Sequence, residues 1–198
     1  MKYESIGDIF SANQKFRDGL VGTLGAITPG EASLLAPAEG WTIQQIAEHV
    51  SIVDTGIARI CTKLLGDSLP HAESSAAGAF SLSTQFGTRA AEMGGLRVEA
   101  PDQVKPTGNV SVADSIKIIE DNRHAYEAMR ADFEHLDFSG ATFPHPFFGP
   151  LTAGEWLVMS GLHKYRHTKQ IASVAEKIRN EKIPGQKEGN PAGDETSN

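Results

Sequence analysis

Cysteine is almost absent from this chain of 198 residues, which contains Cys61 alone. A single thiol cannot form an intramolecular disulfide, and such a composition is typical of proteins of the reducing cytoplasm, where we expect this one. The same scarcity excludes a zinc site built on several cysteines. The seven histidines are therefore the abundant ligands that the chain offers to a transition metal.

Positive charge and long apolar runs are also scarce. Lys and Arg total 18 against 25 Asp and Glu, so the formal net charge is −7. Proteins that bind nucleic acids or anionic membranes gather basic residues, so we expect neither partner. No stretch approaches the roughly 18 apolar residues of a transmembrane helix, and the first residues do not open an apolar secretion signal. Apolar residues still make up 39% of the chain, which is typical of a globular protein.

Four long segments repeat apolar residues with the spacing of an amphipathic helix. They cover residues 6–27, 42–65, 111–136 and 152–178. Two of them begin with the pattern of a capping box, Thr42-Ile-Gln-Gln45 and Thr152-Ala-Gly-Glu155, in which the first and last side chains bind each other's backbone N–H groups. Helices of this number and length predict an all-α fold, a four-helix bundle.

The lengths of the connections predict how these helices run. About 14 residues join the first helix to the second, and a similar number join the third to the fourth, whereas residues 66–110 separate the second from the third. Short connections favour antiparallel neighbours, and a long crossover allows two successive helices to be parallel. We therefore expect an up-down-down-up bundle over residues 1–181. Residues 82–93 are compatible with a short helix in the crossover, and the Gly- and Pro-rich residues 182–198 predict a disordered tail.

His163 and His167 stand four residues apart, so both imidazoles lie on one face of the fourth helix. That face also carries Trp156 and Ile171 and is expected to be buried. Two neutral imidazoles side by side in a core need partners for their nitrogens, and a shared metal ion is one such partner. His49 lies at the edge of the inward stripe of the second helix and can reach the same interior. Three histidines would leave positions open on a metal, as catalytic sites do.

The alternative for each of these histidines is a structural one. A core histidine often only hydrogen-bonds a neighbouring helix, and this alternative stays open for His49 and for the pair. Glu48 is adjacent to His49 but turned away by about 100° on a helix, so we expect a solvated charge. We also expect Lys164 and Arg166 to be exposed cations, and the alternative for either is to hold the carboxylate of an anionic thiol cofactor.

Two further residues are candidates for the surroundings of the site. Gln170 follows His167 by three residues on the same face, so it is either a hydrogen-bond partner of that ligand or a core amide. His145 lies in the stiff aromatic loop Phe143-Pro-His-Pro-Phe-Phe-Gly149 before the fourth helix. It either lines a pocket or packs within the loop.

The segments around the three histidines resemble a known family. Trp41-Thr-Ile-Gln-Gln-Ile-Ala-Glu-His49-Val is similar to the second-helix motif of the DinB-like (DinB/YfiT) superfamily. Leu162-His163-Lys-Tyr-Arg-His167-Thr-Lys-Gln170-Ile resembles its fourth-helix motif, His-x-x-x-His-x-x-Gln-Ile. The order and spacing of the motifs, including the long crossover, also match.

The resemblance implies a bundle that binds a divalent metal through His49, His163 and His167. Zinc or nickel is favoured, and iron and manganese are alternatives, because imidazole suits several metals. It also implies an enzyme acting on a small-molecule substrate, either an S-transferase that uses a low-molecular-weight thiol or a hydrolase. Dimers are common in the superfamily, so a homodimer is expected. The alternative is a non-catalytic metal-binding or stress-response module whose metal is structural.

Overall fold

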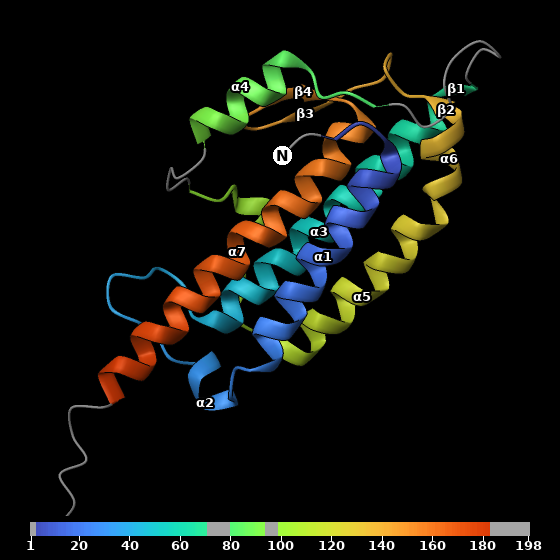
Figure 1. Cartoon of the computed structure of the whole chain (residues 1–198). Helices are drawn as coiled ribbons and strands as arrows, with labels where there is room; N and C mark the ends of the chain where they lie inside the picture. Colours follow the sequence, from blue (N-terminus) through green and yellow to red (C-terminus); the bar gives the residue numbers. More distant parts are fainter. Residues whose placement is uncertain (1–2, 71–79, 94–98, 183–198) are drawn as a thin grey trace, which may run out of the picture.

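The computed structural model describes residues 3–70, 80–93 and 99–182, and four long helical rods form a bundle (Figure 1). The rods are α1 (Ile6–Gly25), α3 (Ile43–Gly66), α5 (Val112–Ala128) extended by α6 (Arg130–His135), and α7 (Ala153–Lys182). The predicted all-α four-helix bundle is confirmed. None of the helices among the described residues is long and apolar enough to cross a membrane.

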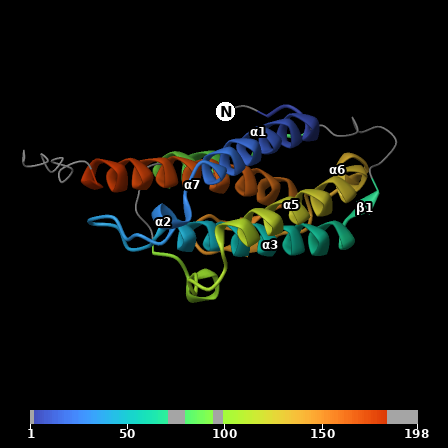
Figure 2. The same ribbon diagram turned by 90° about the horizontal axis from the view of Figure 1, so that it is seen from below.

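The helices run in the predicted directions. α1 and α7 run one way along the bundle, and α3 and α5 run the other way (Figures 1 and 2). α7 packs against both α1 and α3, and α3 packs against α5. The up-down-down-up order is therefore confirmed, with α3 and α5 as the parallel pair joined by the crossover.

Local hydrogen bonds define where the helices begin. The side chain of Thr42 accepts a hydrogen bond from the Gln45 N–H at 3.2 Å, and the Gln45 side chain accepts one from the Thr42 N–H at 3.0 Å. The predicted box at the start of α7 also forms, because Glu155 and Thr152 exchange the equivalent bonds at 3.1 and 3.3 Å. These bonds satisfy N–H groups that have no partner inside the helix.

Within the residues that the structure describes, the connections contain short elements. They are α2 (Pro29–Ala32), α4 (Thr84–Met93), the 3-10 helix η1 (Asp102–Val104), and four strands: β1 (Leu69–Pro70), β2 (Leu136–Asp137), β3 (Phe143–His145) and β4 (Gly149–Leu151). β1 pairs with β2, and β3 pairs with β4, both antiparallel. The predicted short helix in the crossover is present as α4. α7 extends to Lys182, the first residue of the predicted tail. The rest of the tail, residues 183–198, lies outside the described residues.

α1 and α7 approach each other closely at a glycine. A Cβ atom on Gly161 of α7 would lie 1.9 Å from Oδ1 of Asn13 and 3.0 Å from the Phe16 ring, both on α1. The Asn13 side chain is held in place, because its Nδ2 donates a hydrogen bond of 2.9 Å to the Leu157 carbonyl of α7. Glycine at this position lets the two backbones and the Asn13 bridge fit together.

The apolar core is divided into two clusters. One cluster joins the start of α1, the second half of α3 and the start of α7, and includes Ile9, Cys61 and Leu157. The other joins the end of α1, the first half of α3 and the second half of α7, and includes Ile46 and Ile171. Between them lie the buried polar side chains of Ser51 and Asp54 on α3 and of Ser160 and Lys164 on α7. We call these four side chains the polar layer, and the candidate site borders it.

Candidate metal centre

Three imidazole nitrogens converge between α3 and α7. Nε2 of His163 lies 3.2 Å from Nε2 of His49 and 3.1 Å from Nε2 of His167. In the described part of the chain, these are the potential metal ligands that gather in a group of three or more. We call His49, His163 and His167 the histidine cluster.

The helices explain why these three rings meet. His163 and His167 are one turn apart on α7, so their side chains project from the same face. α3 packs antiparallel along that face and contributes His49. The Trp41 ring, from the segment just before α3, covers the His49 ring at a centroid distance of 4.9 Å.

Two of the rings are oriented by partners on their outer nitrogens. Nδ1 of His49 lies 2.7 Å from the Val104 carbonyl oxygen, and Nδ1 of His167 lies 2.8 Å from Oε1 of Gln170. An oxygen of this kind only accepts, so each Nδ1 carries the proton and donates it. The Nε2 atoms of His49 and His167 are then unprotonated, and their lone pairs face His163. One N–H on His163 cannot satisfy both well, whereas a cation would satisfy all three.

The distances also fit a metal ion. Zinc–nitrogen bonds of about 2.0–2.1 Å place nitrogens about 3.3 Å apart in a tetrahedral site and about 2.9 Å apart in an octahedral one. The two measured separations, 3.1 and 3.2 Å, lie between these values. The residues present therefore suit a divalent ion bound by three imidazoles.

Burial keeps the cluster uncharged. It lowers the pKa of His49 and that of His163, and it lowers the pKa of His167 to about 3. The nearby rings and the Arg166 charge act in the same direction on His163 and His167. Neutral imidazole is the form that coordinates a metal, so the cluster is in its binding form at neutral pH.

The other candidate residues differ in their placement. Gln170 contacts His167, as described, whereas Arg166 is exposed. His145 lies in β3 and packs on Phe148 and Trp156, with ring centroids 5.0 and 5.1 Å away. These contacts are local to the β3–β4 hairpin and the first turn of α7, so the structure does not bring His145 to the histidine cluster.

The expectation that Glu48 is a solvated charge is wrong. Glu48 is 1% exposed, and its carboxylate accepts hydrogen bonds from Thr107 N–H and Oγ1 at 3.0 and 2.7 Å and from Gly108 N–H at 2.7 Å. The crossover folds back over this face of α3, which helical periodicity alone does not reveal. Gly108 adopts a φ of +82°, a conformation that favours glycine, and so allows the turn. The contact holds the crossover beside His49.

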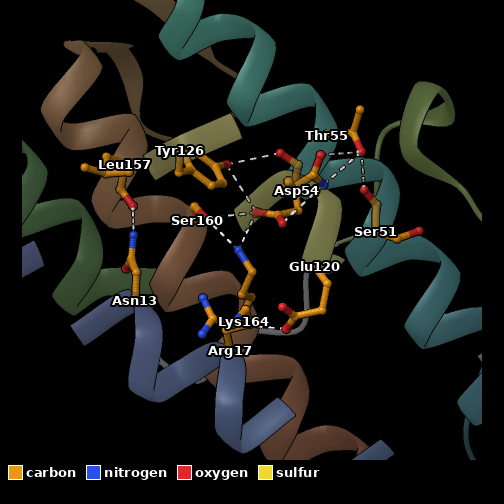
Figure 3. Close-up of polar contacts among 11 residues, drawn as sticks. Asn13, Arg17, Ser51, Asp54, Thr55, Glu120, Tyr126, Leu157, Ser160 and Lys164 are labelled. Carbon is orange, nitrogen blue, oxygen red and sulfur yellow. Dashed lines mark hydrogen bonds and ion pairs between the residues drawn. The ribbon is translucent and has the colours of Figure 1, made fainter. Parts of the chain in front are cut away.

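The expectation that Lys164 is an exposed cation is also wrong. Lys164 is 4% exposed and forms an ion pair with Asp54 of α3 in the polar layer (Figure 3). Asp54 is not among the residues predicted from the sequence. A signal was present, because Asp54 lies four residues after Val50 and three before Ile57, on the apolar stripe of α3. A carboxylate on such a stripe requires a buried partner.

Comparison with known proteins places this site in a family. The model of the DinB superfamily matches residues 13–171, which include the whole histidine cluster. The chain belongs to the DinB superfamily. It is 24% identical over 142 residues to the uncharacterized protein YuaE of Bacillus subtilis (strain 168), covering 71% of this chain and 81% of that protein.

A solved structure supports the four-helix-bundle fold. The protein TT2238, described as a four-helix bundle protein, superimposes with a TM-score of 0.56 at 21% identity. The match covers 84% of this chain and 98% of that one. At this identity the likeness shows the shared fold.

Proposed function

We propose that this DinB-superfamily chain is a metal-dependent enzyme whose divalent ion is held by His49, His163 and His167. The observation that carries the proposal is the convergence of three neutral Nε2 atoms, two of them oriented by hydrogen bonds on Nδ1. Three protein ligands leave at least one position for a small molecule, the pattern of catalytic sites. Zinc and nickel are the favoured ions, and iron and manganese are the alternatives.

The proposed reaction is activation of a small nucleophile. Lewis acidity supplied by a divalent ion lowers the pKa of a thiol or a water so that its anion can attack at neutral pH. The chain's own part is to hold the ligand rings in one tautomer and to keep them uncharged by burial. With a low-molecular-weight thiol the enzyme is an S-transferase, and with water it is a hydrolase. The proposal includes a small-molecule substrate and a homodimer.

Metal content tests the ligand assignment. Purified chain is dialysed against zinc or nickel and then against metal-free buffer, and bound metal is measured by mass spectrometry. We expect about one ion per chain in the unmodified protein and a large loss in His163→Ala. His124→Ala is the matched control, because His124 is exposed on α5 and should leave the metal content unchanged. Full metal content in His163→Ala would show that the assignment is wrong.

A non-catalytic role is the second candidate, and burial favours it. His49 and His167 are only 5% and 6% exposed, which also suits a closed structural site. Turnover of an electrophile such as chlorodinitrobenzene with a panel of thiols, and of simple esters without thiol, separates the candidates. A metal-loaded chain that turns over none of them supports the structural role.

A further inference from the structure

A buried ion pair lies next to the histidine cluster on the same two helices. Lys164 directly follows His163 on α7, and its ammonium group pairs with the Asp54 carboxylate of α3. The side chains are 5% and 2% exposed. The pair and its neighbours lie among α3, α5 and α7 (Figure 3).

Asp54 is held by more than the lysine. Its carboxylate accepts hydrogen bonds from Ser160 Oγ at 2.9 Å, from the Tyr126 hydroxyl at 3.2 Å and from Asn122 Nδ2 at 3.3 Å. Lys164 Nζ in turn donates to Ser160 Oγ at 2.7 Å. The carboxylate therefore has a fixed position relative to α5 as well as α7, and it fixes the lysine.

Stability alone is a weak reason for such a pair. Removing two charges from water costs several kcal/mol per ion, and apolar replacements of buried pairs are often neutral or stabilising. What a buried pair does supply is a defined geometry, because misaligned neighbours would leave a charge without a partner.

The pair and the histidine cluster lie on opposite sides of the α3–α7 contact. His49 is contacted by Trp41 and by the Val104 carbonyl, both from connecting segments. Asp54 is contacted by Tyr126 and Asn122 of α5, on the other side. Contacts on both sides of a helix pair prevent one helix from rotating about its axis.

A metal site tolerates only small displacements of its ligand atoms, so even a small rotation of α7 would weaken binding. A side-chain atom about 5–6 Å from the helix axis moves by about 1 Å when the helix rotates by about 10°. Metal–ligand distances tolerate only about 0.2 Å. A rotation that apolar packing would accept with small rearrangements is therefore enough to separate His163 and His167 from His49.

The polar layer does not form a reaction centre of its own. Ser160 and Lys164 have the spacing of a nucleophile and base, but the lysine is paired with Asp54, so it is not a free base. The adjacent cavity has a volume of about 30 Å³ and is lined in part by Asn13, Arg17 and Tyr126. That volume suits one or two water molecules rather than a substrate.

We propose that Asp54 and Lys164 are positioning residues of the metal centre, which fix the rotation and register of α7 against α3 so that the three Nε2 atoms converge. The inference rests on the proposed metal function. Asp54 and Lys164 do not bind the metal themselves, but through the helices they affect how tightly it binds.

The decisive variant is the double substitution Asp54→Asn with Lys164→Met in the full chain. It removes both charges together, so neither is left buried without a partner, and we expect an unfolding midpoint close to that of the unmodified chain. Affinity for zinc is measured by competition with a chromophoric chelator, and the visible spectrum of the cobalt-loaded chain reports the coordination geometry. We expect zinc to bind about tenfold more weakly or worse, with a changed cobalt spectrum.

Lys177→Met is the matched control. Lys177 is also on α7 and pairs with a carboxylate of another segment, Glu39, but at the surface. It should leave both zinc affinity and the cobalt spectrum unchanged. If the double variant binds zinc within twofold of the unmodified chain with the same cobalt spectrum, the positioning role is refuted while the metal function stands. If the unmodified chain binds no divalent ion, the proposed function and the inference both fail.

A second variant covers the case in which the double variant does not fold. Asp54→Glu keeps both charges but lengthens the pair by one methylene, which shifts the helices if the pair sets their register. We expect a folded chain with weaker zinc binding and an altered cobalt spectrum. Unchanged affinity in folded Asp54→Glu overturns the inference.

Discussion

At the scale of single residues, buried hydrogen bonds set the protonation of the histidines. Outside the cluster, Nδ1 of His145 accepts hydrogen bonds from the N–H groups of Phe147 and Phe148 at 3.1 and 3.3 Å. Burial lowers the pKa of His145 to about 4. Protonating Nδ1 would remove both acceptor contacts, so the fold favours the neutral ring.

This arrangement predicts an acid-sensitive hairpin. Because the pKa of His145 is about 4 in the folded chain and 6.5 in its ordinary state, the unfolded chain binds more protons between these values. The contribution of His145 to stability is therefore complete above pH 6.5 and declines as the pH falls towards 4, by at most about 1.4 kcal/mol per pH unit. Urea unfolding from pH 7 to 4.5 measures it. His145→Asn, with a non-titrating oxygen near the place of Nδ1, should show a shallower decline, and an identical slope would contradict the prediction.

Glu48 provides a second residue-scale prediction. In Glu48→Ala the N–H groups of Thr107 and Gly108 lose their acceptor while the crossover still covers them. Charge-assisted bonds of this kind predict a loss of about 2–4 kcal/mol in the free energy of unfolding. Denaturant unfolding measures the loss. Glu176→Ala, at an exposed position of α7, serves as the control and should change stability little. An equally small effect at Glu48 would show that its hydrogen bonds to the crossover do not stabilise the fold.

At the scale of whole elements, close approach of α1 and α7 depends on Gly161. Gly161→Ala would gain about 1 kcal/mol of helix propensity. The new methyl group would displace the Asn13 side chain and press on Phe16, at a cost of about 1–3 kcal/mol for overpacking plus a lost hydrogen bond. The cost exceeds the gain, so we expect a net destabilisation of about 1–2 kcal/mol in denaturant unfolding.

Gly22→Ala is the matched control for that substitution. Gly22 is a helical glycine of α1, and a Cβ there would meet nothing within 4 Å. It should therefore stabilise the chain by about 0.5–1 kcal/mol through helix propensity alone. Stabilisation of similar size in both variants would show that the α1–α7 approach has room for a methyl group.

Elements and caps were predictable from the sequence because their signals are local. A helix period and a capping box involve residues three or four apart, so Thr42 and Glu155 could be interpreted without knowing the fold. The partners of the buried charges could not be predicted, because they are distant in the sequence: Glu48 binds Thr107, 59 positions away, and Lys164 binds Asp54, 110 positions away. The histidine cluster lies between these cases, since His163 and His167 are local and His49 joins them only through helix packing.

At the scale of the whole molecule, the two apolar clusters can form without a metal. Each cluster draws on α1, α3 and α7, so both ends of the bundle hold the same helices together. We therefore expect the metal-free chain to remain folded, unlike small domains whose only core is a metal site.

Chelation tests this expectation. An ion present at 100 times its Kd stabilises the folded chain by about 2.7 kcal/mol, which for a chain of this size raises Tm by several degrees. Adding a chelator should lower Tm by that amount while the far-ultraviolet circular dichroism at 20 °C stays helical. His163→Ala should have the lower Tm from the start and show no response to chelator. Loss of helical signal on chelation would contradict the independence of the two clusters.

The division of the core has a consequence for how such chains diverge. Because the histidine cluster lies beside the polar layer and between the two apolar clusters, substitutions at its positions would remove the proposed metal site before they affected folding. A relative that replaced His49 or His167 would keep the bundle and lose the proposed site. Sorting relatives by the residues at these positions, rather than by overall shape, should separate chains able to bind a metal there from chains that are not.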